Sequence, residues 1–185
     1  MTFDGPQHLT LKGSLILADP SLRDPNFSRS VLILTEHQPD KGAHGYILNR
    51  PLNKVVGDVL EATEFSELRQ VPIYIGGPVG QEHLTFAAFQ WLPDGRCLSY
   101  ATHLSTKEAI RRFREGETVR AFLGYACWGE GQLENELKQK SWITRKPASG
   151  VLKSGVSVEL WSELLSSMGP WYQLLAGTPE NPSLN

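Results

Sequence analysis

The sequence has little of what marks a disulfide-rich or metal-stabilised protein. Its 185 residues include only two cysteines, Cys97 and Cys127. Their spacing resembles no zinc site, and two thiols fit a reducing compartment. The sequence alone does not exclude a disulfide between them. The sequence therefore predicts no metal site.

Charge of one sign and long apolar runs are also missing. The formal net charge is −2, which gives no reason to expect broad attraction to nucleic acid or to an anionic membrane. No apolar run reaches the length that spans a membrane, and Met1 to Lys12 lacks the basic patch and apolar core of a signal peptide. We therefore expect a cytoplasmic protein that has no membrane partner and recognises other molecules locally.

The chain is long enough to bury a core as one domain. Its 40% hydrophobic and 21% charged residues are typical of globular proteins. Residues 1–12 are mostly polar, and the end of the chain is rich in Pro, Gly, Asn and Ser. We predict a flexible N-terminus over 1–12, a single domain over 13–176 and a disordered tail over 177–185.

The order of strand and helix patterns favours an α+β fold. Ser30 to Glu36 is a continuous β-branched and aliphatic run, and Ala43 to Asn49 follows it after a polar turn, which predicts a hairpin. Further strands are expected at 14–18, 71–75, 83–91, 96–102, 118–125 and 151–152, and helices at 55–61, 105–115, 132–140 and 158–168. Because hairpins are interrupted by helices, we predict a mixed, mostly antiparallel sheet with flanking helices.

The densest group of reactive side chains lies between residues 124 and 136. Cys127 follows an expected strand and precedes an expected helix, where amide donors and the helix dipole would stabilise a thiolate. We favour a structural role, because free cysteine is among the most buried residue types and Tyr125 stands where a nucleophile elbow has glycine. Trp128 and Trp142 are predicted to anchor this stretch by packing.

Carboxylates and a histidine offer a second catalytic route. Glu130 and Glu134 are four residues apart and share a helix face, whereas Glu136 points elsewhere. Acidic side chains in a first helical turn also interact favourably with the helix dipole, which is a structural role. His37 follows the central strand and can transfer protons near neutral pH, but no second histidine stands at a metalloenzyme spacing. We favour a turn histidine bonded to backbone or water.

Arginine supplies the candidate anion-binding groups. Arg50, in Asn49-Arg50-Pro51, can grip a carboxylate or phosphate with two hydrogen bonds, and the alternative is an ion pair with Asp24 or a glutamate. The glycine-rich segment 76–80 lacks the lysine of a P-loop and the dinucleotide spacing, so we interpret it as a turn and predict no cofactor. The basic helix face at 107–114 has no recognition-helix pattern or interleaved aromatics, so nucleic-acid binding is not supported.

Several short segments occur together in an order that resembles one bacterial family. They are Asp24-Pro25-Asn26-Phe27-Ser28-Arg29-Ser30-Val31, Glu36-His37, Gly45-Tyr46-Ile47-Leu48-Asn49-Arg50-Pro51, Gly76-Gly77-Pro78-Val79, Gly124-Tyr125-Ala126 with Trp128, Gly131-Gln132-Leu133-Glu134, and Trp142. Together they cover most of residues 10–175, and the sequence resembles the YqgE/AlgH family. The resemblance implies a compact α+β domain with a sheet bent toward a pseudobarrel, a bacterial cytosolic location, and uncharacterised or transcription-regulating relatives.

Two hypotheses about function follow. In the first, the chain is a non-catalytic regulatory or ligand-binding domain in which polar side chains beyond the strand ends surround one cleft. That cleft would hold a small anionic ligand or a protein segment through Asp24, Arg29, His37, Asn49, Arg50, Tyr125, Trp128, Gln132 and Glu134. In the second, a hydrolase or transferase uses Cys127, or Glu134 with His37. Direct DNA binding is a third and weaker hypothesis.

Overall fold

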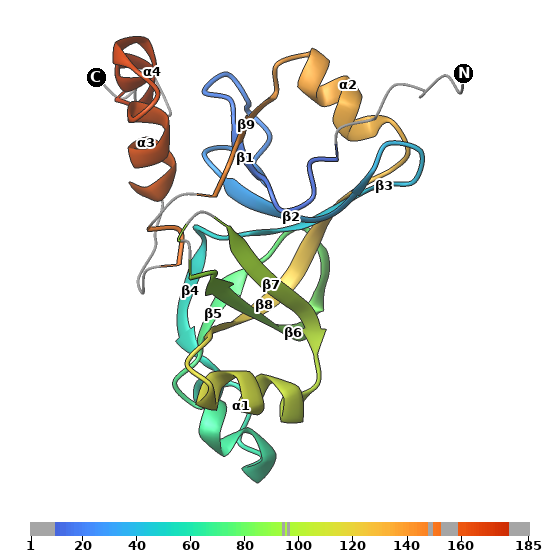
Figure 1. Cartoon of the computed structure of the whole chain (residues 1–185), viewed down its shortest axis with the longest axis vertical. Coiled ribbons are helices and arrows are strands. Elements are labelled where there is room, and N and C mark those ends of the chain that lie inside the picture. Colours follow the sequence, from blue (N-terminus) through green and yellow to red (C-terminus); the bar gives the residue numbers. More distant parts are fainter. Residues whose placement is uncertain (1–9, 94, 96, 148–149, 153–158, 178–185) are drawn as a thin grey trace.

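A curled mixed sheet forms the body of the molecule (Figure 1). The computed structural model describes residues 10–93, 95, 97–147, 150–152 and 159–177. Within them nine strands follow the order β4-β5-β8-β3-β2-β1-β9, with β6 on β8 and β7 on β6. The strands are β1 (Leu15–Ala18), β2 (Val31–Gln38), β3 (Gly42–Ile47), β4 (Pro51–Val55), β5 (Pro72–Ile75), β6 (Val79–Trp91), β7 (Leu98–Leu104), β8 (Thr118–Trp128) and β9 (Trp142–Arg145). The predicted α+β class with a bent, mostly antiparallel sheet is confirmed.

Helices lie at both ends of the sheet (Figure 1). They are α1 (Thr106–Arg114), α2 (Gln132–Lys138), α3 (Glu159–Ser166) and α4 (Pro170–Ala176), with short 3-10 helices η1 (Val56–Asp58) and η2 (Thr63–Leu68). Ser105 caps α1 as its sequence predicts, because its hydroxyl accepts a hydrogen bond from the Glu108 amide at 3.3 Å. No described helix is long and apolar enough to cross a membrane.

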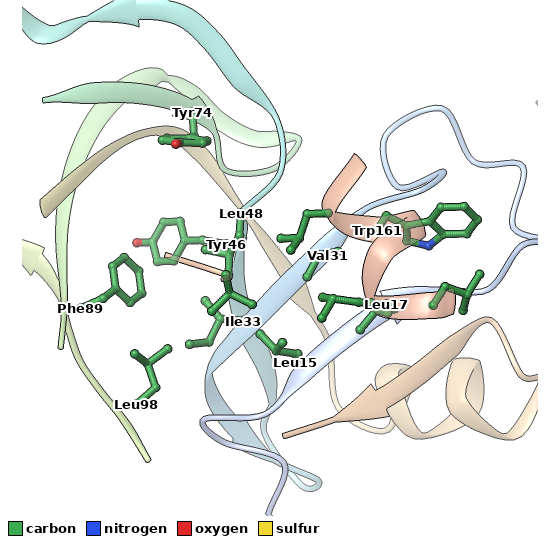
Figure 2. Close-up of a cluster of buried hydrophobic side chains, with 14 of the residues drawn as sticks. Leu15, Leu17, Val31, Ile33, Tyr46, Leu48, Tyr74, Phe89, Leu98 and Trp161 are labelled. Atoms are coloured by element: carbon green, nitrogen blue, oxygen red, sulfur yellow. The ribbon is translucent and has the colours of Figure 1, made fainter. Parts of the chain in front are cut away.

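The predicted hairpin over residues 30–49 is confirmed as β2 and β3. Both faces of β2 are buried, since Val31 and Ile33 belong to one hydrophobic cluster and Leu32 and Leu34 to another. Figure 2 shows the first cluster, in which Trp161 of α3 lies beside the side chains of β1 and β2. The second cluster includes Leu133 of α2. The continuous apolar run of β2 is therefore explained by helices that cover it on opposite sides.

Strand β8 extends further than its sequence predicts. It continues past Tyr125 to Trp128. It pairs with β5 through residues 121–123, with β6 through residues 118–123 and Tyr125, and with β3 through residues 126–128. Gly124, at φ 71°, lies between the residues that pair with β5 and those that pair with β3, and its positive φ lets the strand change direction there. Gly77 lies so close to Tyr125 that an added Cβ would overlap its backbone. Cys127 is consequently part of a strand, and the prediction that it lies between the end of the strand and the start of the helix is wrong.

Other boundaries also differ from expectation. Val151 and Leu152 form a turn rather than the predicted strand, while β9 and α4 were not predicted. Leu11 and Lys12 fall in the segment predicted to be flexible, yet Leu11 donates to His37 at 2.9 Å and Lys12 pairs with Glu36 at 2.8 Å. The remaining predictions for 1–9 and 178–185 concern residues outside the described part of the chain.

Candidate functional site

The segment Asp24–Ser30, here called the 24–30 loop, is the place where several of the sequence motifs meet. Its beginning is shaped locally, because Asp24 Oδ1 accepts from the Asn26 amide at 2.8 Å and the Asp24 carbonyl accepts from the Ser28 amide at 2.7 Å. Asp24 is exposed. The hydrogen bond between Asp24 Oδ1 and the Asn26 amide forms an Asx-type turn that begins the loop. This predicted site residue therefore has a structural role.

Asn49 and Arg50 hold the other end of the loop. The buried Asn49 side chain accepts from the Val31 amide at 2.8 Å and donates to the Arg29 carbonyl at 2.9 Å. Arg50 Nη2 donates to the Ser28 carbonyl at 3.1 Å. These bonds satisfy backbone groups that the irregular chain cannot pair for itself. The family-like motif at 49–51 thus fixes the loop 20 residues before it in the sequence.

Arg29 lies at the centre of this arrangement. Its backbone has φ 53°, an uncommon conformation for a residue other than glycine. Its guanidinium carbon lies 5.3 Å from the centroid of the Trp161 ring, a cation–π contact. The Trp161 indole is itself fixed, since its Nε1 donates to the Ala18 carbonyl at 2.8 Å.

A hollow of about 330 Å³, here called the Arg29 hollow, opens between the loop and the C-terminal helices. Its walls combine cationic, hydroxyl, carboxylate and apolar side chains. They are Asp19, Pro20, Ser21, Leu22, Arg23, Ser28, Arg29, Trp161 and Leu175. Of the nine predicted site residues, only Arg29 lines it directly.

Phe27 ties the loop to α2 through an aromatic cluster. Its ring lies 6.1 Å from that of Trp128 and 5.5 Å from that of Trp142. Both indoles donate to Oε2 of Glu136, at 2.9 and 2.7 Å. The predicted anchoring role of the two tryptophans is confirmed.

Glu136 was not predicted as part of the site, although it organises the aromatic cluster. Gln132 Nε2 donates to Glu136 Oε1 at 2.9 Å, and Gln132 Oε1 accepts from the Gly129 amide at 3.0 Å. A carboxylate six to eight residues from two tryptophans was the available signal. To use that signal one must know that Trp128 ends strand β8 and Trp142 begins strand β9, on either side of α2. The local sequence pattern does not reveal this arrangement.

His37 and Glu134 form a close pair on the far side of β2. His37 Nδ1 accepts from the Leu11 amide at 2.9 Å, so its proton is on Nε2, which lies 2.7 Å from Glu134 Oε1. Both ring nitrogens are therefore occupied, and the imidazole has no lone pair for a substrate proton. The pair fastens α2 and the start of the domain to β2. Glu134 Oε2 is buried without a hydrogen-bond partner among the described residues.

Comparison with known proteins shows the family to which this fold belongs. The AlgH-like family model matches residues 15–173. The chain belongs to the AlgH-like family. Relatives described as UPF0301 proteins include one from Cytophaga hutchinsonii, 34% identical over 94% of this chain and 98% of the relative. Another, from Chlorobium luteolum, is 33% identical over 94% of each.

Two solved structures share the fold of this AlgH-like chain. The AlgH protein from Pseudomonas aeruginosa has a TM-score of 0.66 and 28% identity, over 97% of this chain and 98% of that one. A protein from Corynebacterium diphtheriae has a TM-score of 0.69 over 91% and 92% of the two chains. At 21% identity this second likeness concerns the fold alone.

The predicted site residues of the AlgH-like domain do not surround one cleft. Asp24, Arg29, Asn49 and Arg50 lie at the start of β2, and His37 and Glu134 lie at its end. Val31 and His37 are six residue steps apart along the strand, which is about 20 Å. Trp128 and Gln132 connect to the first group indirectly, through Phe27 and Glu136.

Tyr125 and Cys127 belong to a different face of the sheet. Tyr125 stacks on His44 at 4.5 Å. Cys127 is exposed, so the expectation of a buried structural cysteine is wrong. Side chains alternate along a strand, and those of Ala126 and Trp128 occupy the buried positions on either side.

The basic helix face of the AlgH-like domain is neutralised within the chain. Arg111 and Arg112 pair with Glu108, at 2.7 and 2.9 Å, and Arg114 pairs with Glu67 at 2.6 Å. Each guanidinium thus has a carboxylate beside it. In the part of the chain that the structure describes, no group of three His, Cys, Asp or Glu side chains is arranged to hold a metal ion.

Proposed function

We propose that this AlgH-like chain is a non-catalytic regulatory domain of the bacterial cytoplasm that binds a small anionic ligand in the Arg29 hollow. One observation carries the proposal. Three separate motifs converge on the 24–30 loop: Asn49-Arg50 bonds its end, and Trp128 and Trp142 each pack against Phe27 in its middle. A loop held this firmly presents its side chains in a fixed arrangement, which lowers the entropic cost of binding.

The lining of the hollow suits an anion attached to a compact body. Arg23 and Arg29 contribute guanidinium groups that can bind carboxylate or phosphate, and Ser21 and Ser28 contribute hydroxyl donors. Leu22, Leu175 and Trp161 supply apolar surface. The volume falls at the lower end of the range of about 300–1,000 Å³ that is usual for small-molecule sites.

The position of Arg29 also supports a ligand rather than structural role. A residue with positive φ is strained at a cost of about 1–3 kcal/mol, and such strain concentrates at functional sites. Here the strain is maintained by the Asn49 bond to the Arg29 carbonyl. The cation is thereby directed over Trp161 and into the wall of the hollow.

Regulation would follow from the elements that line the hollow. Trp161 belongs to α3 and Leu175 to α4, so a ligand would contact the C-terminal helices and the loop together. Ligand binding would then favour one packing of these helices over others. Because the arginines of α1 are paired with carboxylates, a regulator of this kind would act through its ligand or a protein partner rather than by direct contact with DNA.

The alternative function, in which the chain is a hydrolase or transferase that uses Glu134 with His37, has weaker support. A general base needs a free lone pair within reach of the substrate proton. The Leu11 amide occupies Nδ1 of His37, and Glu134 lies against Nε2.

A thermal-shift screen of phosphorylated and carboxylated metabolites, followed by calorimetric titration, tests the proposal. A ligand at 100 times its Kd should stabilise the native chain by about 2.7 kcal/mol. Arg29→Gln should abolish that stabilisation, while Arg114→Gln, outside the hollow, should leave it intact. Equal binding by Arg29→Gln and the wild type would refute the proposed site.

A further inference from the structure

Strand register places a thiol, an imidazole and a carboxylate in one row. His44 of β3 stands opposite Cys127 of β8 on one side and opposite Glu36 of β2 on the other. Directly opposite residues project from the same face, with Cβ atoms about 4.5–5.5 Å apart. Cys127 is exposed and His44 is partly buried, so a partly buried imidazole stands opposite an accessible thiol in the strand register.

Hydrogen bonds to Thr35 determine which nitrogen of His44 carries the proton. The Thr35 hydroxyl contacts the His44 carbonyl at 3.2 Å and His44 Nδ1 at 3.1 Å. The hydroxyl has one hydrogen, and a carbonyl only accepts. Both contacts are satisfied when the hydroxyl donates to the carbonyl and Nδ1–H donates to the hydroxyl oxygen. His44 Nε2 then keeps its lone pair and can accept a proton.

The surroundings favour the neutral form of this imidazole and hold the ring in place. Burial lowers the pKa of His44, and the neighbouring His103 lowers it further. The ring stacks on Tyr125 at 4.5 Å and meets Tyr46 edge-on at 5.3 Å. A hollow of about 240 Å³ is lined by Glu36, Lys41 and His44 among others, and Cys127 is not part of its lining.

Cys97 provides a comparison within the same molecule. It is also an exposed free cysteine. It precedes β7, and its carbonyl accepts from the Leu92 amide at 2.9 Å. No imidazole stands opposite it in the strand register of the described residues. The two thiols therefore share exposure and differ in the neighbouring base.

We propose that Cys127 is a modification site that exchanges with low-molecular-weight disulfides, with His44 as the base. The Cys127 sulfur attacks one sulfur of R–S–S–R, and its proton passes to His44 Nε2. A new bond forms between Cys127 and one R–S group while the original S–S bond breaks. The departing thiolate takes the proton from His44 and leaves as R–SH, so Cys127 is oxidised and one R–S group is reduced. This site is independent of the Arg29 hollow.

The test is to treat the reduced full-length chain with oxidised glutathione and measure modification of each cysteine by peptide mass spectrometry over time. Cys127 should react at least tenfold faster than Cys97 in the same sample. His44→Gln should slow Cys127 to within about twofold of Cys97 without changing the rate at Cys97, and Cys97→Ser should leave the rate at Cys127 unchanged.

Equal rates at the two cysteines of the wild-type chain would overturn the proposal, and this comparison requires no variant to fold. An unchanged Cys127 rate in folded His44→Gln would overturn it as well. Thr35→Val supplies an independent check, because it keeps the imidazole but removes the hydroxyl that fixes the tautomer. Its Cys127 rate should fall between those of the wild type and His44→Gln, and a rate equal to the wild type would contradict the role of Nε2.

Discussion

The side chain of Asn49 donates a hydrogen bond of 2.9 Å to the carbonyl oxygen of Arg29. Asn49 is fully buried and does not line the Arg29 hollow, whereas Arg29 does. The residue that determines where the cation lies is therefore separate from the residue that would touch a ligand. This division of roles lets mutations distinguish the shape of the loop from the chemistry of the hollow.

Asn49→Ala should destabilise the fold and release the 24–30 loop. The change leaves the Val31 amide and the Arg29 carbonyl without their partner, and an unsatisfied buried group costs about 1–3 kcal/mol. We expect a loss of about 2–4 kcal/mol in chemical denaturation. Asn135→Ala, at an exposed position of α2, should change stability by less than about 0.5 kcal/mol. Equal stability of the two variants would contradict the role of Asn49.

Glu136→Ala should loosen the contact between α2 and the loop. The carboxylate accepts from both Trp128 and Trp142, and hydrogen bonds to charged groups contribute about 1.5–3 kcal/mol each. We expect a loss of about 2–4 kcal/mol and a changed tryptophan emission spectrum. Glu130→Ala, an exposed residue outside the cluster, is the matched control. An emission spectrum unchanged in Glu136→Ala would show that the indoles do not depend on this carboxylate.

His37→Ala should free the beginning of the domain without unfolding the sheet. The Leu11 amide loses its acceptor, so its hydrogen exchange should accelerate at least tenfold, while the amides of β2 stay protected. Glu134→Gln keeps an amide oxygen that can accept from Nε2 and should leave Leu11 protected. Slow Leu11 exchange in His37→Ala would mean that other contacts hold this segment.

Acidification should destabilise the protein partly through His44. Burial lowers the pKa of His44 in the folded state, so below the unfolded pKa of about 6.5 the unfolded chain binds more protons than the folded chain. The contribution of His44 to the unfolding free energy is therefore full above that pH and falls as the pH drops toward the folded pKa. His103 strengthens this effect and Glu36 opposes it.

Denaturation midpoints measured between pH 7.5 and pH 5 test this sign. His44→Phe should lose less stability than the wild type over that pH range. The difference between the two chains gives the contribution of the His44 imidazole to the unfolding free energy. His83→Phe, at an exposed histidine with an exposed partner, should retain the wild-type slope. Identical slopes in His44→Phe and the wild type would exclude a contribution from His44.

Local sequence patterns were sufficient for several parts of the fold. The β2–β3 hairpin followed from an apolar run and a polar turn, and α1 followed from Ser105 as its cap. These features depend on neighbouring residues, so a short window contains their cause. Strand β9 and the end of β8 were missed because they are strands through pairing with β1 and β3.

The candidate site was predicted in composition more than in arrangement. Arg29, Asn49 and Arg50 were identified as candidates, and the structure joins them through the 24–30 loop. His37 and Glu134, 97 residues apart, were named together and do meet, but both nitrogens of the imidazole are occupied. Cys127 was weighed without His44, since only the register of β3 on β8 brings those two residues side by side.

The sequence by itself determined the family, the α+β class, the β2–β3 hairpin and the polar side chains available for chemistry, because apolar periodicity, caps and short motifs act over a few residues. The tertiary structure alone decided which of those side chains share a site. Strand register set His44 opposite Cys127, and the alternation of side chains along β8 left the thiol on the exposed face. The loop geometry placed Arg29 over Trp161, more than 130 residues later in the chain. Such contacts depend on how distant elements pack, and no local pattern encodes them.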